Sequence, residues 1–213
     1  TFLSAVMHCG DEQTIGGRLG EAAAGRLAER LRALGLRLGR LKTGTTPRLD
    51  GRTIDWDRVD SQTETVPMGH FSFTPPTSRL PTIDCHIAYT NAHTHQLIRD
   101  SLHRSPLFTG QIEGRGPRYC PSIEDKITRF TDRERHQLFL EPEGLKTHRV
   151  YVNGLSTSLP ADVQAAMVRT IKGLERAEIL QEGYAVEYDF ADPRDLDHGL
   201  QHRSIPGLFL AGQ

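Results

Sequence analysis

The chain opens with the apolar run Thr1-Phe2-Leu3-Ser4-Ala5-Val6-Met7, which predicts a strand, and a glycine-rich loop follows at residues 10–20. Residues 22–34 place leucines at helical spacing among arginines, which predicts an amphipathic helix that ends at Gly35. Residues 36–41 alternate apolar and polar side chains, as a second strand would. Strand, glycine-rich loop, helix and strand in this order favour a fold of mixed helices and strands.

The rest of the chain continues this mixed pattern. Further strands are predicted at residues 83–89, 138–140, 150–152 and 184–190, and further helices at residues 94–102 and 160–172. Residues 60–82 hold four prolines among serines and threonines, which indicates irregular structure. The sequence therefore predicts an α/β or α+β fold whose proline-rich middle belongs to an inserted module.

Composition excludes two classes of protein. Of the 213 residues, 37% are hydrophobic, which is too many for a disordered chain. No apolar run approaches the roughly 20 residues that a membrane-spanning helix needs, so a membrane protein is not expected. The formal net charge is −1, so any contact with nucleic acid requires a local basic patch.

The cysteines and the two ends of the chain give further expectations. Cys9, Cys85 and Cys120 are an odd number and lie far apart, as reduced thiols of a cytosolic protein would. No CxxC pair is present, which argues against a structural zinc site. The chain starts inside one apolar run and stops just after another, residues 208–211, which predicts a strand at the end and a piece of a longer protein. A short final strand on a small sheet is the alternative.

The densest group of reactive residues lies at residues 114–130. Pro121 suits the first position of a helix, and Cys120 would then lie at the positive end of the helix dipole, near Arg118. Both features lower the pKa of a thiol, although Glu124 and Asp125 oppose this effect unless they stabilise the first turn instead. The free amides of such a turn suit a phosphate equally well. The alternative to both is a structural role, in which Cys120 is a small thiol packed under a helix cap.

Four other candidates carry weaker signals. Cys85 is expected in the core, whereas Cys9 suits either a structural or a reactive role. His93 and His95 resemble half of a metal site, but capping and hydrogen-bonding histidines are commoner. Residues 42–48 form a predicted basic loop that suits an anion, although they lack the P-loop pattern. The run Gly16-Gly17-Arg18-Leu19-Gly20 departs from the GxGxxG dinucleotide motif by one residue.

Taken together, several stretches resemble the GidA or MnmG family, flavoproteins of tRNA wobble-uridine modification. The most specific is Arg118-Tyr119-Cys120-Pro121-Ser122-Ile123-Glu124-Asp125-Lys126. The resemblance holds in order and spacing over essentially the whole chain, through residues 1–3, 16–18, 39–45, 104–106, 116–126, 139–145, 156–160, 183–189 and 208–213.

The resemblance implies a larger protein, of which this chain is the central portion. It implies Rossmann-like FAD-binding portions at residues 1–48 and 156–213, flanking an inserted mixed α/β domain at residues 49–155. The implied protein is cytoplasmic and homodimeric. It acts with the GTPase MnmE and with FAD, NADH and methylenetetrahydrofolate. The implied reaction adds an aminomethyl or carboxymethylaminomethyl group to carbon 5 of the wobble uridine, U34, of certain tRNAs.

The same resemblance implies the site residues. The stretch associated with NAD binding comprises Gly116, Pro117, Arg118, Tyr119, Cys120, Pro121, Ser122, Ile123, Glu124, Asp125, Lys126, Ile127, Thr128, Arg129 and Phe130. Gln213 is expected to contact FAD, whereas Ala24 stands where a flavin-binding serine is expected. Cys120 is the catalytic candidate, because a thiolate that adds to carbon 6 of uracil makes carbon 5 nucleophilic. Another important cysteine of the family lies upstream of this chain.

Two alternatives to a tRNA-modifying enzyme remain at this point. The chain suits a binding module that contacts nucleotide or tRNA without catalysis of its own. A related folate- and FAD-dependent tRNA uridine methyltransferase is the other alternative, and the segment around Cys120 argues against it.

Overall fold

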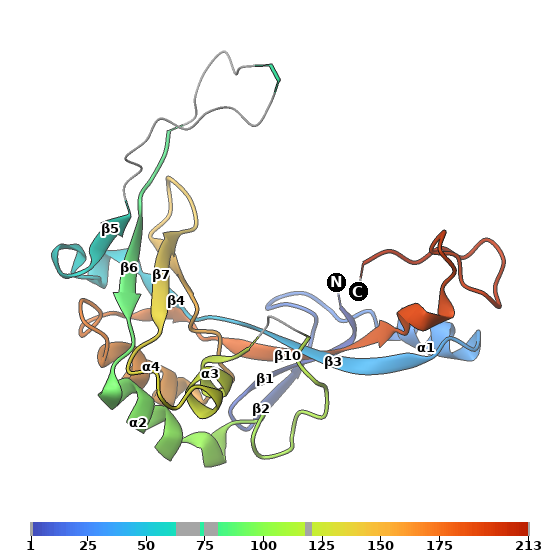
Figure 1. Cartoon of the computed structure of the whole chain (residues 1–213), viewed down its shortest axis with the longest axis horizontal. Helices are drawn as coiled ribbons and strands as arrows, with labels where there is room; N and C mark the ends of the chain where they lie inside the picture. The colour runs from blue at the N-terminus through green and yellow to red at the C-terminus, as the bar shows by residue number, and fades with distance from the viewer. Residues whose placement is uncertain (1, 63–72, 75–80, 118–120, 213) are drawn as a thin grey trace.

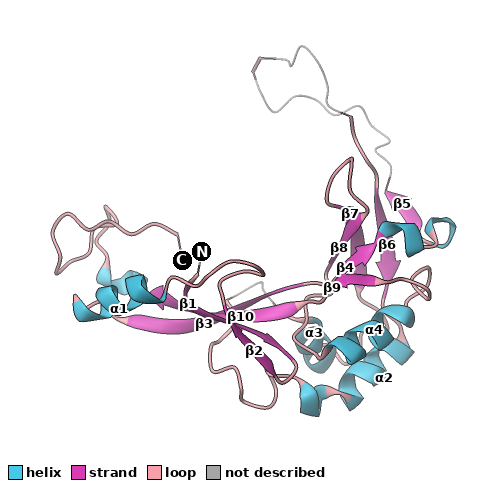
Figure 2. Cartoon of the chain, turned by 180° about the vertical axis from the view of Figure 1, so that it is seen from behind, coloured by secondary structure: helices cyan, strands magenta, loops and turns pink. Residues whose placement is uncertain are grey.

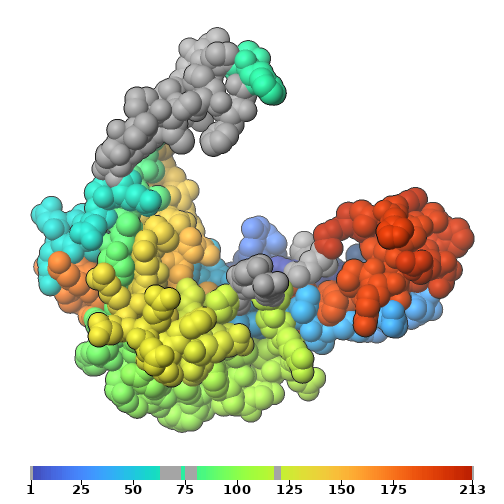
Figure 3. Space-filling model, viewed as in Figure 1, coloured from blue at the N-terminus to red at the C-terminus, as the bar shows by residue number. Residues whose placement is uncertain are grey.

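The computed structural model describes residues 2–62, 73–74, 81–117 and 121–212. Arg118, Tyr119, Cys120 and Gln213, which the sequence analysis placed in the site, lie outside the described residues, as does most of the proline-rich stretch. Within the described residues the strands form two sheets, which make two lobes of the molecule (Figures 1 and 3).

The first sheet contains four strands in the order β2-β1-β10-β3. Their bounds are Leu3–Cys9 for β1, Glu12–Ile15 for β2, Leu38–Thr45 for β3 and Tyr184–Ala191 for β10. Each neighbouring pair is antiparallel, and β10 pairs with β3 over its whole length. Helix α1, Gly25–Ala33, packs on β1 and is followed by Gly35, whose φ of 87° is a left-handed conformation that glycine adopts readily.

The second sheet contains six strands in the order β5-β6-β7-β8-β4-β9. Their bounds are Arg48–Asp50 for β4, Asp60–Gln62 for β5, Cys85–Tyr89 for β6, Gln137–Pro142 for β7, Arg149–Asn153 for β8 and Ile179–Gln181 for β9. Three helices gather against this sheet, as Figure 2 shows, and they are α2, Ala92–Asp100, α3, Ile123–Arg129, and α4, Ala161–Arg169. Short 3-10 turns occur at Gly51–Thr53, Trp56–Arg58, Leu102–Arg104 and Pro193–Asp195.

The main core lies between the second sheet and its helices. Leu138 and Leu140 of β7 pack there with Ile98 of α2, Ile127 of α3 and Met167 of α4, all at most 1% exposed. Helix α4 and strand β9 follow residue 155 in the chain and still belong to this lobe. A smaller core fills the first sheet. None of the helices in the described residues is long and apolar enough to span a bilayer.

One buried side chain joins the two lobes. Gln164 of α4 donates from its amide nitrogen to the carbonyl of Gly183, just before β10, over 2.8 Å, and accepts from the amide of the same glycine over 2.7 Å. Its nitrogen also donates to the Leu159 carbonyl. The side chain is fully buried, so both of its polar atoms are satisfied by the backbone. The two lobes are thus joined by hydrogen bonds between the Gln164 side chain and the backbone of Gly183. The pattern of hydrophobic residues in the sequence does not predict such a contact.

The mixture of helices and strands is confirmed, and most predicted elements exist with shifted ends. Three local predictions are wrong. The predicted loop at residues 10–20 contains β2, which pairs with β1 as a hairpin. The predicted basic loop at residues 42–48 is divided between β3 and β4. The predicted final strand at residues 208–211 forms only a single bridge, between Phe209 and Gln201.

The amphipathic pattern of α1 predicts the helix but not its packing. Ala28 is the buried residue of this helix, whereas Leu27 and Leu34 are 54% and 61% exposed. The close approach of α1 to β1 is made by alanine, and the two leucines face away from the described residues of the sheet. Helical periodicity alone does not reveal which face has a partner.

Candidate functional site

A cavity of about 650 Å³ lies between β3, the loop at residues 112–117 and α3. Its wall is formed by Lys42, Leu107, Ile112, Glu113, Gly114, Arg115, Gly116, Pro117, Pro121, Asp125, Arg129 and Phe130. The cavity thus gathers much of the stretch predicted to bind NAD with the first cation of the predicted anion-binding loop. Its volume is within the range of small-molecule sites.

The loop at residues 112–117 is held by one buried carboxylate. Oε1 of Glu187, in the middle of β10, accepts hydrogen bonds from the amides of Glu113 over 3.0 Å and Gly114 over 2.5 Å. Oε2 of the same carboxylate lies 3.2 Å from Nη2 of Arg40 on the neighbouring strand β3. Both oxygens therefore have charge-assisted or amide partners, as a buried carboxylate requires.

The backbone of the loop also joins strand β3. The amide of Lys42 donates to the carbonyl of Arg115 over 2.9 Å, and Leu41 forms an isolated parallel bridge with Arg115. A Cβ atom at Gly114 would lie 2.8 Å from the Leu41 carbonyl oxygen, closer than a real Cβ atom tolerates. Glycine at position 114 therefore permits the loop to lie directly against β3.

Lys42 extends from β3 into the wall of the cavity. The residue is 3% exposed, and its Nζ lies 3.8 Å from Oδ2 of Asp125 on α3. Arg129, one turn further along α3, has Nη2 3.4 Å from the other oxygen of Asp125. The wall as a whole contains three cations, Lys42, Arg115 and Arg129, and two carboxylates, Glu113 and Asp125, so one positive charge remains for an anionic group of a ligand.

Helix α3 starts later than the sequence analysis predicted. Ser122 is its N-cap, and its hydroxyl accepts from the amide of Asp125, whose carboxylate in turn accepts from the amide of Ser122. Pro121 precedes this capping box and is not the first helical residue, because the serine competes for the capping position. The expectation that Asp125 stabilises the first turn is confirmed.

The predicted phosphate site on the first-turn amides of α3 is not supported. The amide of Ile123 donates to the Ser156 carbonyl over 2.7 Å, and the amide of Asp125 is taken by the Ser122 hydroxyl. These donors are therefore already paired within the protein.

Glu124 is a buried structural carboxylate and does not line the cavity. Its Oε1 accepts from the Thr157 hydroxyl over 3.0 Å and from the Ser158 amide over 3.1 Å. The residue is fully buried, and its Oε2 has no hydrogen-bond partner among the described residues. Glu124 therefore fixes α3 to the segment that precedes α4.

Lys126 also points away from the cavity. Its Nζ donates to the Gly154 carbonyl over 3.1 Å, and burial lowers the pKa of the ammonium group. Ile123 and Ile127 are in the core, whereas Phe130 is 54% exposed and borders the cavity. Of the described residues predicted to bind NAD, those at the cavity wall are Gly116, Pro117, Pro121, Asp125, Arg129 and Phe130.

Sequence reasoning missed Glu187, although a signal exists. The residue stands in the apolar strand β10, where both faces are largely buried. A carboxylate in such a run needs partners, because an unpaired buried charge is costly. That argument predicts a partner for Glu187 but does not identify residues 113 and 114.

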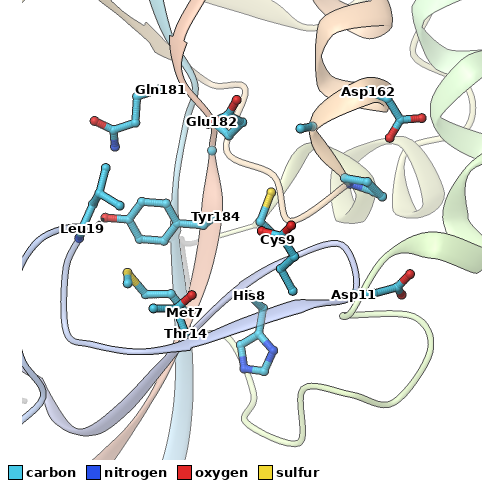
Figure 4. Close-up of a pocket in the computed structure, with 14 residues that line it drawn as sticks. Met7, His8, Cys9, Asp11, Thr14, Leu19, Asp162, Gln181, Glu182 and Tyr184 are labelled. Atoms are coloured by element: carbon cyan, nitrogen blue, oxygen red, sulfur yellow. Dashed lines mark hydrogen bonds between the residues drawn. The ribbon is translucent and has the colours of Figure 1, made fainter.

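Cys9 lies beside a second cavity, of about 620 Å³, at the end of β1 near Tyr184 of β10 (Figure 4). Its sulfur donates to the Leu159 carbonyl and accepts from Nε2 of Gln164, over 3.6 and 3.5 Å. Burial, reinforced by Glu182 and Glu12, raises the pKa of this thiol to about 11. Of the two roles that the sequence left open, the geometry favours the structural one.

The remaining cysteine differs from its prediction. Cys85, which was expected in the core, is only half-buried in β6 and is not one of the core residues, and burial raises the pKa of its thiol. Nε2 of His95 lies 2.7 Å from the Thr90 hydroxyl, which is the hydrogen-bonding role expected of a common histidine. In the part of the chain that the structure describes, no three His, Cys, Asp or Glu side chains are grouped to hold a metal ion.

The chain is similar to known proteins over its whole length. The family model described as glucose inhibited division protein A matches residues 1–213. A tRNA uridine 5-carboxymethylaminomethyl modification enzyme MnmG from Granulibacter bethesdensis is 55% identical over 213 residues, which are all of this chain and 34% of the relative. The chain thus spans about a third of the length of this curated relative.

Two solved structures of a GidA protein are also similar to this chain. Aquifex aeolicus GidA in the form II crystal matches with a TM-score of 0.87 and 44% identity, over 100% of this chain and 34% of that chain. The form I crystal of the same protein matches with a TM-score of 0.88 and 47% identity, over 98% of this chain and 36% of that chain. At these identities the fold of the described residues is that of GidA.

The raised pKa of Cys9 leads to a prediction about its reactivity. At pH 8 a thiol with a pKa of about 11 is ionised to roughly one part in a thousand. Its alkylation by iodoacetamide should therefore be about a hundredfold slower than that of an unperturbed cysteine, and should rise about tenfold per pH unit towards pH 11. Peptide mass spectrometry on the native chain measures this rate, with the urea-unfolded chain as control. A rate that levels off near pH 8.5 in the native chain would contradict the burial argument.

Proposed function

Because the chain belongs to the glucose inhibited division protein A family, we propose that it is the central part of a flavoprotein that modifies tRNA. The proposed reaction adds an aminomethyl or carboxymethylaminomethyl group at carbon 5 of the wobble uridine. The full-length protein uses FAD, NADH and methylenetetrahydrofolate, acts with the GTPase MnmE in the cytoplasm and is a homodimer. For the domain division we propose FAD-binding portions at residues 1–48 and 156–213 and an inserted part at residues 49–155, with α4 and β9 of the last portion packed on the inserted lobe.

The observation that carries this proposal is the cavity beside Lys42. Gly116 lies in its wall, where the lack of a side chain leaves the backbone open to a ligand, and Gly114 holds the same loop against β3. Lys42 and Arg129 supply cations from two elements that are far apart in sequence. A dinucleotide has a pyrophosphate that such cations bind and apolar rings that suit Leu107, Ile112 and Phe130. The described residues therefore fit a nicotinamide dinucleotide.

The fit to FAD rests on fewer described residues. Ala24, which stands where the family is expected to have a serine, donates its amide to the Phe2 carbonyl over 3.1 Å and has no hydroxyl to offer. Gln213, the other expected contact, lies outside the described residues. A bound FAD would supply hydride acceptance from NADH and transfer of the folate-derived carbon.

In the proposed mechanism the protein contributes position and a nucleophile. Lys42 and Arg129 bind the phosphates of NADH, and the loop at residues 112–117 forms the wall against which the dinucleotide lies. Cys120 adds its thiolate to carbon 6 of the uracil, and the electron pair of the carbon 5–carbon 6 bond makes carbon 5 nucleophilic. Loss of the proton from carbon 5 to a base, together with loss of the thiolate from carbon 6, then restores the carbon 5–carbon 6 double bond and frees Cys120.

The role of Lys42 is tested by Lys42→Gln in the full-length protein. The dissociation constant of NADH should rise about tenfold, because the substitution removes one charge-assisted contact worth ~1.5 kcal/mol or more. Titration of the protein with NADH measures this constant. Lys146→Gln is the matched control, since Lys146 is exposed and lies outside the cavity wall. Equal dissociation constants of NADH in the two variants, with unchanged melting temperatures, would show that Lys42 does not bind NADH.

The role of Cys120 is tested by Cys120→Ser in the full-length protein. We expect the modification of U34 to fall by at least a hundredfold, while the visible absorbance of bound flavin is retained, because a hydroxyl is a far weaker nucleophile than a thiolate. Mass spectrometry of digested tRNA measures the modification. Cys9→Ser, which changes the structural thiol, should keep most of the activity. Normal turnover in the Cys120 variant would exclude this residue from the mechanism.

A further inference from the structure

A third hollow, of about 750 Å³, lies in the lobe of the second sheet, away from the residues of the candidate site. Its wall is built from Arg58, the β5–β6 pair, the start of α2, residues 131–135 and Lys172. We propose that this hollow, the basic cleft, binds the phosphodiester backbone of an RNA strand. The choice of a phosphodiester rests on the geometry, and the choice of RNA rests on the proposed function.

The cleft concentrates positive charge on an otherwise neutral chain. Its five cations come from four separate segments of the chain and are Arg58, Arg99, Arg133, Arg135 and Lys172. Two carboxylates, Asp60 and Glu134, also line it, which leaves an excess of three positive charges. The whole chain has a net charge of −1, so this excess is a local feature and not a consequence of composition. A chain with a net charge close to zero needs a local basic patch to contact nucleic acid, and the cleft is such a patch.

Most of these cations are available to a ligand. Arg99, Arg133 and Lys172 are exposed, and none of them forms an ion pair with a carboxylate of the described residues. Arg58 does have such a partner, because its Nη1 lies 2.9 Å from Oε1 of Glu175. Cations without carboxylate partners lose little when they bind a phosphate, and they release counterions from the nucleic acid.

Arg135 is oriented by an aromatic ring. Its guanidinium carbon lies over the Tyr89 ring, 4.3 Å from the ring centre, in a cation–π contact that holds the cation at the cleft. A guanidinium held in this way keeps N–H groups that can bind phosphate oxygens in pairs. A cation stacked on an aromatic ring is also a surface on which a base can stack.

The start of α2 adds to the same positive potential. Thr90, Asn91 and Ala92 line the cleft, and Asn91 caps the helix by accepting from the Thr94 amide over 3.0 Å. The helix has nine residues, and its positive dipole end thus borders the cations. The side chain of His95, also in the wall, is buried, and burial lowers the pKa of its imidazole. The charge of the cleft therefore comes from its arginines and lysine.

The distribution of the cations favours a polymer of phosphates over a single nucleotide. They are spread along the cleft on separate elements and do not converge with a glycine-rich loop, because none of the lining residues is glycine. Repeated charges of a nucleic-acid backbone suit such a distribution. An acidic peptide is the competing class of ligand, which lacks the bases that a stacked guanidinium accepts.

The test neutralises three cations of the cleft in the full-length protein. The cleft variant combines Arg99→Gln, Arg133→Gln and Lys172→Gln. The control variant combines Arg26→Gln, Arg30→Gln and Lys146→Gln, which removes the same number of positive charges from exposed positions outside the cleft. The probe is an unmodified tRNA transcript with uridine at position 34. At 0.1 M salt the dissociation constant of the cleft variant should rise at least tenfold. The slope of log affinity against log salt should become shallower by about 2, at ~0.7 per phosphate of a single strand.

Three outcomes decide the proposal. Affinity and salt slope equal to those of the control variant would overturn it, provided that both variants melt like the wild type. Competition by a polyglutamate peptide as strong as that by an RNA oligonucleotide of equal charge would overturn the choice of RNA. The wild-type protein is assayed for U34 modification in parallel. Cleft-dependent tRNA binding without that activity would support the cleft and refute the proposed function.

Discussion

The candidate site depends on the buried carboxylate of Glu187. It is 7% exposed and lies where β10 pairs with β3, and it accepts two amide hydrogen bonds from a loop more than 70 residues earlier in the chain. Arg40 completes its partners at 3.2 Å. Nε2 of His8, 3.9 Å away, has no hydrogen-bond partner among the described residues, and burial lowers the pKa of that imidazole more than Glu187 raises it. A neutral His8 leaves Glu187 to bind the loop and Arg40.

A second buried carboxylate positions the other wall of the cavity. Glu124 holds α3 through Thr157 and Ser158, so the face of the helix with Asp125 and Arg129 is turned towards Lys42. The two anchors lie in different lobes, and Gln164 joins the lobes through Gly183. Loss of the hydrogen-bond partners of a buried carboxylate would leave its charge unpaired in the protein interior, which is costly. Each of the two carboxylates therefore resists small rearrangements of the groups that it binds. The cavity is in this way a product of the whole chain and not of one motif.

Much of the fold follows from local patterns, whereas the site follows only in part. Strand alternation and helical spacing predict most elements, because they depend on neighbours in sequence. These patterns fail at residues 42–48, whose polar, glycine-containing sequence predicts a loop. The residues instead belong largely to β3 and β4, because the pairing of β3 with β10 stabilises an extended conformation there. The patterns fail again at Pro121, because the capping preference of Ser122 is the stronger signal. Glu187 and Gly114 are brought together by tertiary contacts, which no spacing rule detects.

Amide hydrogen exchange in the full-length protein tests the central claim most directly. In Glu187→Ala, the peptide that covers residues 111–117 should exchange at least tenfold faster than in the wild type, because two amides lose their acceptor, and the dissociation constant of NADH should rise with it. Glu187→Gln, which keeps one acceptor oxygen, should show a smaller change, and the peptides of α4 should not change. Unaltered exchange at residues 111–117 in the alanine variant, with its fold intact, would contradict the claim that this carboxylate holds the loop.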